Sequence, residues 1–127
     1  MTDNELVKHA EGAKKQSYSP YSNFRVGAAV LTVSGGVYYG TNIENVSFGA
    51  TSCAERNAIF SAVCDGERKI EALAISSDSE NYTYPCGICR QVISEFAGKD
   101  TKIICANNKG EFEVMNFFDL LPKDFKI

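Results

Sequence analysis

The chain has 127 residues and a mass of 13.9 kDa, with 44% hydrophobic and 23% charged residues. This balance is typical of one globular domain, here residues 1–127. A formal net charge of −3 and a pI near 5.1 disfavour a nucleic-acid-binding surface, which would be basic, and favour a small-molecule substrate. The polar first residues precede no apolar run, and no stretch has the length of a membrane span, so we expect a cytoplasmic protein without a membrane partner.

The first half of the chain predicts a helix followed by a β-hairpin. Thr2 and Glu5 make a capping-box pattern, and apolar residues recur at helical spacing over the first fifteen or so residues. A serine-rich loop, 17–24, comes next. Two apolar runs, 26–33 and 37–43, then flank a Ser-Gly-Gly sequence that is typical of a hairpin turn.

The second half predicts helices that alternate with strands. One helix is expected from about Cys53 to Cys64, with Gly66 as its stop, and another from Cys86 to Ala97, after Pro85 and before Gly98. The remaining segments are expected to be strands at 70–76, 102–106 and 112–115, a loop at 77–85 and a helical turn at 116–122. This order predicts an α/β fold, a three-layer α/β/α sandwich with a mixed five-stranded sheet.

Three of the five cysteines predict a catalytic zinc site. Cys86 and Cys89 are three positions apart, so both thiols can face one ion from the first turn of a helix. A third thiol from Cys53 would leave a tetrahedral zinc with one open position, as catalytic zinc requires. A Cys-x-x-Cys pair alone also fits a redox pair or a structural zinc knuckle, but neither explains a second Cys-Ala-Glu motif. Cys64 would lie roughly 16 Å from Cys53 along its helix, and Cys105 fits an apolar core strand.

Glu55 and Arg56 are the candidate side chains beside the metal. If Cys53 occupies the first position of its helix, the helix end can point at the ion and Glu55 can serve as a proton shuttle. Arg56 would neighbour the Cys53 thiolate and offset the net charge of three thiolates on Zn²⁺. Alternatively, Glu55 is an ordinary acidic residue that stabilises the first helical turn, and Arg56 is an exposed arginine in a surface ion pair. His9, the only histidine, lies in a solvated helix, where a structural role is expected.

With these residues assembled, the chain resembles the small, homotetrameric cytidine deaminases over nearly its full length. The motifs that carry the resemblance are Ser22-Asn23-Phe24-Arg25-Val26-Gly27-Ala28-Ala29, Thr41-Asn42-Ile43-Glu44-Asn45, Thr51-Ser52-Cys53-Ala54-Glu55-Arg56-Asn57 and Pro85-Cys86-Gly87-Ile88-Cys89-Arg90-Gln91. The resemblance implies that Asn42 and Glu44 bind the ribose hydroxyls. It also implies that Phe24 packs at the base and sugar and that Ala54 contacts the substrate. Phe125 would stack on the base in a neighbouring subunit's site, so that the homotetramer shares its active sites.

The activity implied by this resemblance is hydrolysis of cytidine, and of 2′-deoxycytidine, to uridine or deoxyuridine and ammonia. One Zn²⁺ per chain would activate water, and Glu55 would move the protons. Three alternatives remain: another aminohydrolase of this fold, similar to blasticidin S deaminase; an enzyme that edits cytosine in RNA or DNA; and a non-catalytic zinc-binding module. The acidic balance disfavours the second alternative, and the third would have a closed metal site.

Overall fold

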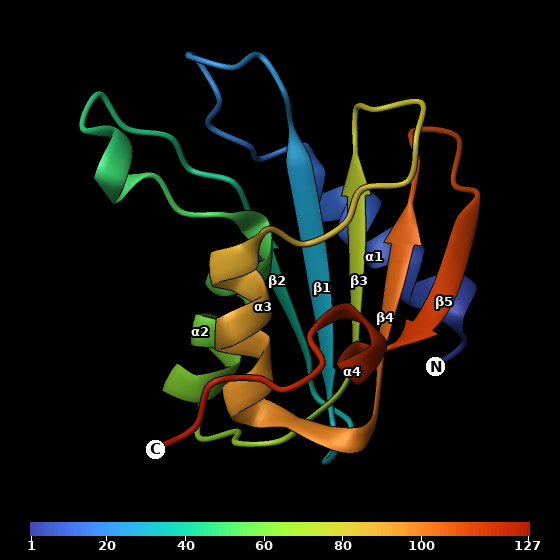
Figure 1. Cartoon of the computed structure of the whole chain (residues 1–127). Coiled ribbons are helices and arrows are strands. Elements are labelled where there is room, and N and C mark those ends of the chain that lie inside the picture. The colour runs from blue at the N-terminus through green and yellow to red at the C-terminus, as the bar shows by residue number, and fades with distance from the viewer.

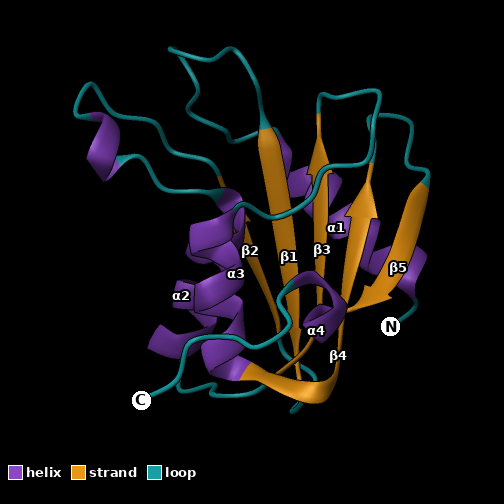
Figure 2. Ribbon diagram, in the orientation of Figure 1, coloured by secondary structure: helices purple, strands orange, loops and turns teal.

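The computed structural model describes residues 1–127, which form a five-stranded sheet with helices on both faces (Figure 1). The elements are α1 (Asp3–Lys14), β1 (Val26–Thr32), β2 (Val37–Thr41), the 3₁₀ helix η1 (Phe48–Ala50), α2 (Ala54–Cys64), β3 (Ile70–Ser77), α3 (Gly87–Phe96), β4 (Ala97–Ala106), β5 (Phe112–Asn116) and α4 (Phe117–Leu120). Helix α1 covers one face of the sheet, and α2, α3 and α4 lie on the other (Figures 1 and 2). The predicted three-layer sandwich is confirmed.

The sheet is mixed, with the strand order β2-β1-β3-β4-β5. Strand β1 pairs antiparallel with both β2 and β3, and β4 pairs antiparallel with β5. Only β3 and β4 are parallel. Parallel neighbours need a crossover connection, and α3 supplies it on one face of the sheet. The chain therefore leaves β3 at Ser77 and passes through a loop before α3 begins, which places residues 78–86 at one edge of the sheet.

Side chains of different size cover the two faces of the sheet. Because successive residues of a strand point to opposite faces, Leu73 and Ile75 of β3 pack toward α2 and α3, whereas Ala72 and Ala74 pack toward α1. Each fully buried leucine or isoleucine contributes about 1.5–3 kcal/mol to folding. The small residues on the other face let α1 lie close to the sheet. At Gly27 a Cβ atom would lie 2.1 Å from the carbonyl oxygen of Ala10, so no side chain fits there.

The local helix signals have their predicted effects. The Thr2 hydroxyl accepts a hydrogen bond from the Glu5 amide while the Glu5 carboxylate accepts one from the Thr2 amide, so the capping box is confirmed. Gly66 has φ +95° directly after the C-cap of α2, a conformation that glycine adopts at little cost. The helices have at most 12 residues, and none is long and apolar enough to cross a bilayer.

Several boundaries differ from the expected ones, most clearly around α3 and β4. Helix α3 begins at Gly87, not at Cys86, because Cys86 has the extended conformation of an N-cap residue, with φ −69° and ψ 172°. At its other end the helix stops at Phe96, and Ala97 is already extended because it pairs with Ile70 of β3. Strand β4 therefore starts five residues before the expected residue 102. The pairing partner lies 27 residues away in the sequence, so local pattern could not reveal it.

Candidate active site

Two helix N-termini bring three thiols together. Cys53 is the N-cap residue of α2, Cys86 is the N-cap residue of α3, and Cys89 lies in the first turn of α3. Their sulfur atoms all lie within 4.8 Å of one another, and the Sγ atoms of Cys53 and Cys86 are 3.9 Å apart. Because a helix N-terminus favours negative charge, both helices stabilise thiolates at this point. The three predicted metal ligands therefore form one group.

The position of α2 depends on a close approach to β2. A Cβ atom at Gly40 would lie 2.3 Å from the Ala54 carbonyl oxygen and 2.3 Å from the Ala58 amide nitrogen, so a side chain there would displace the first turn of α2. Asn57 adds a polar tie, because its Nδ2 atom donates to the Thr41 carbonyl at 2.8 Å. Together these contacts set where Cys53 and the next two residues lie.

The start of α3 is held by Arg90. Its Nε atom donates to the Pro85 carbonyl at 2.8 Å, and its Nη1 atom donates to the Leu120 carbonyl at 2.8 Å, at the end of α4. Pro85 itself is fully buried. The turn that presents Cys86 is therefore fixed by a charged side chain one turn further along its own helix. The sequence motif contained Arg90, but its role was not predicted.

The Glu55 carboxyl is buried beside the thiols. Glu55 is 5% exposed, in the first turn of α2. Burial raises the pKa of Glu55 to about 7, and the neighbouring negative charge of Cys53 acts in the same direction. The Cys53 thiol has a pKa lowered to about 5, first by the hydrogen bond from Cys89 and then by Arg56. The same bond and burial raise the pKa of Cys89.

Arg56 faces the thiols, as its spacing from Cys53 predicts. Its Nη2 atom donates to Sγ of Cys53 at 3.5 Å and to the Thr51 carbonyl at 3.4 Å. Its Nε atom is buried without a protein partner. An unpaired cationic donor beside three thiols suits a site in which those thiols are ionised by a metal. The residues present therefore fit a divalent cation of the zinc type, with three protein ligands and no fourth.

Asn42 and Glu44 lie together and hold the loop 17–25. Both side chains are 9% exposed. The Glu44 carboxylate accepts hydrogen bonds from the amides of Tyr21 and Ser22, at 2.9 and 3.0 Å, and from the Ser22 hydroxyl. These bonds, the Ser22 hydroxyl first, lower the pKa of Glu44. An isolated bridge between Ile43 and Ser52 places this segment next to the start of α2.

Comparison with known proteins decides the family. A profile described as the cytidine and deoxycytidylate deaminase zinc-binding region matches residues 1–106. A cytidine deaminase of Sporosarcina psychrophila is 45% identical over 98% of this chain and 92% of its own length. One from Halalkalibacterium halodurans is 44% identical over 94% and 91%. The crystal structure of a cytidine deaminase from Burkholderia pseudomallei superposes with a TM-score of 0.94 at 41% identity, covering 98% of this chain and all of that one.

The chain belongs to the cytidine deaminase family. It is accordingly a zinc-dependent enzyme, and its sheet and helices have the arrangement of the cytidine deaminases of known structure. The family membership also removes the non-catalytic zinc module as an alternative.

The remaining predicted site residues of this deaminase are Ala54, at the first position of α2, and two exposed aromatic residues. Ala54 is buried, so it can offer only its backbone amide, which has no acceptor within its own helix. Phe24 is 37% exposed in the loop 17–25, and Phe125 is 71% exposed in the C-terminal tail. Figure 1 places the C-terminus near the C-terminal ends of α2 and α3, whereas the cysteines lie at the N-terminal ends of these helices.

The other cysteines and the histidine of the deaminase take the structural places expected of them. Cys64 is exposed at the end of α2, outside the group of three thiols, and Cys105 is fully buried in the core. His9 lies against Tyr39, with its Nδ1 atom 3.2 Å from the tyrosine hydroxyl. Sequence reasoning missed Ser22 and Asp78, which hold the loop 17–25. In the sequence both residues lie in stretches rich in polar residues, and this was the only signal for them.

Proposed function

We propose that the chain hydrolyses cytidine to uridine and ammonia, and 2′-deoxycytidine likewise to deoxyuridine. The observation that carries this proposal is the burial of the Glu55 carboxyl beside three convergent thiols at the starts of two helices. Relatives that are 45% and 44% identical over nearly the whole chain are named cytidine deaminases, which supports this choice of substrate. We propose that residues 1–127 work as a single catalytic domain.

The metal and Arg56 have separate tasks in this proposal. Cys53, Cys86 and Cys89 would hold one zinc ion, which when bound supplies a Lewis acid that makes water a stronger nucleophile near neutral pH. The Arg56 guanidinium donates to Sγ of Cys53, so its positive charge offsets part of the charge of the three thiolates. Glu55 is not a ligand, and its carboxyl stays free to exchange protons.

Glu55 moves protons between water and the base. Its carboxylate accepts a proton from the attacking water while the bond between oxygen and C4 forms, and it gives that proton to ring N3. A second proton passes from the added hydroxyl through the same carboxyl to the exocyclic nitrogen. The C4–N bond then breaks, and ammonia leaves with uridine as the other product. Because Glu55 is 5% exposed, bulk water has little access to the proton in transit.

The nucleoside would bind between the loop 17–25 and the start of α2. Asn42 and Glu44 would receive the ribose hydroxyls, and Phe24 would pack at the base and sugar. The Ala54 amide, at the first position of α2, would donate to the base. The Glu44 carboxylate lies next to this loop and keeps a negative charge at neutral pH, as an acceptor for sugar hydroxyls requires.

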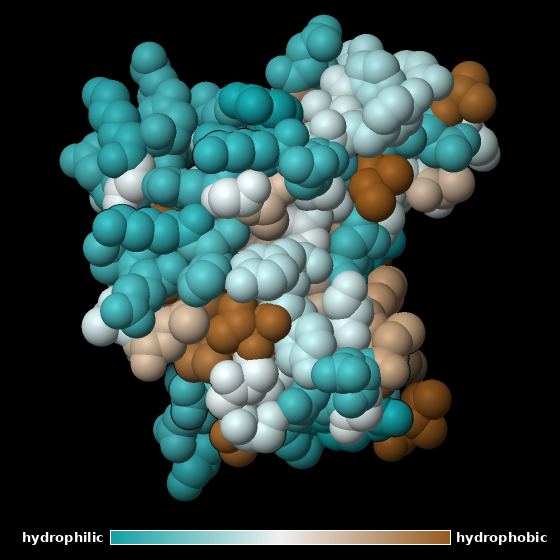
Figure 3. All heavy atoms as spheres, turned by 180° about the vertical axis from the view of Figure 1, so that it is seen from behind, coloured by the Kyte–Doolittle hydropathy of each residue, from teal (hydrophilic) through white to brown (hydrophobic).

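We propose that the enzyme assembles as a homotetramer with shared active sites. In Figure 3 the side covered by α1 is largely hydrophilic, with scattered apolar residues, some of them toward the edge where β2 and the loops before α2 lie. The exposed apolar residues of this region are Tyr39, Ile43, Val46, Phe48 and Phe60. Apolar surface of this kind favours self-association. Within one chain, the tail that carries Phe125 lies away from the thiols. A neighbouring copy would therefore supply its Phe125 to this site.

The five cysteines are all unpaired, and a three-thiolate metal site needs reduced thiols. We therefore propose that the enzyme works in the cytoplasm. We also propose a role in pyrimidine salvage, because the proposed substrates are free nucleosides.

The test is direct. Purified protein carrying one zinc per chain is mixed with cytidine, and uridine and ammonia are measured over time. We expect one ammonia and one uridine for each cytidine consumed. A zinc-loaded, folded protein that releases no ammonia from cytidine or 2′-deoxycytidine would contradict the proposal.

A further inference from the structure

The loop 17–25 and the first residue of β1 carry an unbroken run of bound backbone amides. Each N–H from residue 21 to residue 26 donates a hydrogen bond. The acceptors are, in order, Glu44, Glu44, the Ser19 carbonyl, the Ser22 hydroxyl, Asp78 and Asn42. Four of these six bonds end on side chains outside the loop. A loop held in this way has one backbone conformation, so the direction of its side chains is also set.

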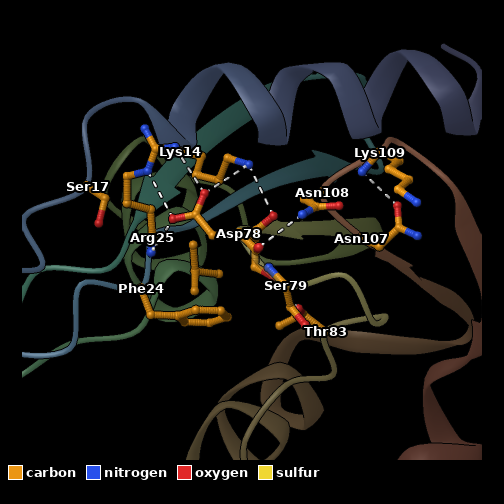
Figure 4. Close-up of polar contacts among 12 residues, drawn as sticks. Lys14, Ser17, Phe24, Arg25, Asp78, Ser79, Thr83, Asn107, Asn108 and Lys109 are labelled. Carbon is orange, nitrogen blue, oxygen red and sulfur yellow. Dashed lines mark hydrogen bonds and ion pairs between the residues drawn. The ribbon is translucent and has the colours of Figure 1, made fainter.

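Asp78 binds the last part of this loop through both its backbone and its charge. Its Oδ2 atom accepts from the Arg25 amide and from Arg25 Nε, each at 3.0 Å, and its Oδ1 atom accepts from Arg25 Nη2 at 3.0 Å. In return, the Asp78 amide donates to the Arg25 carbonyl at 3.2 Å. Lys14 adds a second cation 3.5 Å from Oδ1 and donates to the Ser77 carbonyl (Figure 4).

This contact differs from an ordinary surface ion pair. A single exposed pair contributes little to stability, because water screens it and two long side chains lose freedom. Here the carboxylate is 29% exposed, it receives both forks of one guanidinium, and it also binds a main-chain amide. Bidentate geometry of this type fixes orientation as well as distance. Asp78 therefore ties the end of β3 to the backbone that directly follows Phe24.

Phe24 sits between this tie and the one made by Glu44. Its amide donates to the Ser22 hydroxyl at 3.1 Å, and its carbonyl accepts from Asn42 Nδ2 at 2.8 Å. The preceding residue, Asn23, has φ +55°, a left-handed conformation that costs energy for most residues and that asparagine tolerates. The backbone on both sides of the Phe24 ring is thus fixed. In Figure 4 the Phe24 ring lies apart from the Asp78 contacts.

We propose that Asp78 is a positioning residue of the enzyme: by holding Arg25, it fixes the direction in which Phe24 meets the bound nucleoside. This inference rests on the proposed function, because it takes Phe24 as a substrate contact. Asp78 touches no reacting atom, so its effect reaches substrate binding only through Phe24. The change expected on weakening it is therefore in KM, with kcat nearly unchanged.

The test is a double-mutant cycle with Asp78→Asn and Phe24→Ala. We expect Asp78→Asn alone to raise KM about three- to ten-fold, which is part of the roughly five- to 150-fold that loss of a whole stacking contact gives. In the Phe24→Ala background the same change should alter KM by less than about two-fold, because the group that it positions is gone. Asp3→Asn is the matched control: it removes a surface ion pair of similar exposure, with Lys102, far from the loop, and should leave both constants unchanged.

An equal rise of KM in both backgrounds would overturn the proposal, and so would an unchanged KM in Phe24→Ala or a fall confined to kcat. If Asp78→Asn fails to fold, Arg25→Gln replaces it in the cycle, because this variant keeps the Asp78 bond to the main-chain amide. The same outcomes are then decisive.

A readout without turnover separates this inference from the proposed function. The chain contains no tryptophan, so Phe24→Trp supplies a single fluorescent reporter at the loop. We expect Asp78→Asn in this background to increase acrylamide quenching, and Asp3→Asn to leave quenching unchanged. Identical quenching with and without the Asp78 carboxylate would show that Asp78 does not position residue 24. An absence of cytidine turnover in the wild-type protein would instead refute the proposed function.

Discussion

The Nη2 atom of Arg56 lies 3.5 Å from Sγ of Cys53, across the first turn of α2. The first testable prediction follows from this contact. Arg56→Gln replaces a cationic donor with a neutral one, so the thiolates keep more charge and the metal becomes a weaker Lewis acid. We expect zinc to stay bound and kcat to fall about ten- to 100-fold. Arg68→Gln, a change at an exposed arginine beyond the end of α2, is the control and should not alter turnover. Equal rates for both variants would show that Arg56 has no influence on the site.

The second prediction concerns the metal and the fold together. Because the three thiols join the starts of α2 and α3, removing one should release zinc and also destabilise the packing of these helices. Cys86→Ala should therefore lack zinc in metal analysis and melt at a lower temperature than the wild type. Cys64→Ala removes a thiol outside the group and should keep one zinc per chain. Full zinc content in Cys86→Ala would refute the three-thiolate site.

The third prediction is the pH dependence of stability at Asp78. Hydrogen bonds from Arg25, and after them the charges of Arg25 and Lys14, hold the pKa of Asp78 below its ordinary value. A carboxyl with a lowered folded-state pKa stabilises the protein fully above the unfolded value, about 3.9, and loses this effect as pH falls through the folded value. We expect urea unfolding to show a stability advantage of the wild type over Asp78→Asn at pH 7 that shrinks below about pH 4. A difference that stays constant with pH would contradict this.

The fourth prediction tests the shared active sites. The Phe125 side chain is 71% exposed, and its carbonyl accepts a hydrogen bond from Gln91 of α3 at 3.2 Å. Phe125→Ala should raise KM roughly five- to 150-fold, as loss of a stacking contact predicts, while zinc is retained. Ile127→Ala, a change in the same tail, is the control and should leave KM unchanged.

Mixing two variants then shows whether Glu55 and Phe125 of one active site come from two chains or from the same chain. Mixed oligomers of Phe125→Ala with Glu55→Ala should recover activity with a low KM, because the first chain keeps Glu55 and receives Phe125 from its partner. Mixed oligomers, verified by size, that fail to recover it would place Phe125 and Glu55 in the same chain's site.

The sequence was most informative where function depends on local spacing. Cys86 and Cys89 share a helical turn, and Glu55 and Arg56 lie two and three positions after Cys53, so the geometry of the thiol group followed from the positions of two helix starts. The hairpin and the capping box were equally local. Contacts between distant residues gave no such signal. Arg25 and Asp78 are 53 positions apart, and Ile70 pairs with Ala97. The Glu44 carboxylate binds the amide of Tyr21, more than twenty residues before it. Each depends on strands that meet only in the folded sheet.

The measurement that tests the central claim most directly uses Glu55→Gln, which keeps the shape of the side chain and removes its ability to carry a proton. Zinc content and the rate of ammonia release from cytidine are measured on the same sample. We expect one zinc per chain, as in the wild type, because Glu55 is not among the three ligands. Turnover should fall about 10²- to 10⁴-fold, the contribution typical of a general acid–base group. A zinc-loaded Glu55→Gln protein that releases ammonia at nearly the wild-type rate would contradict the account.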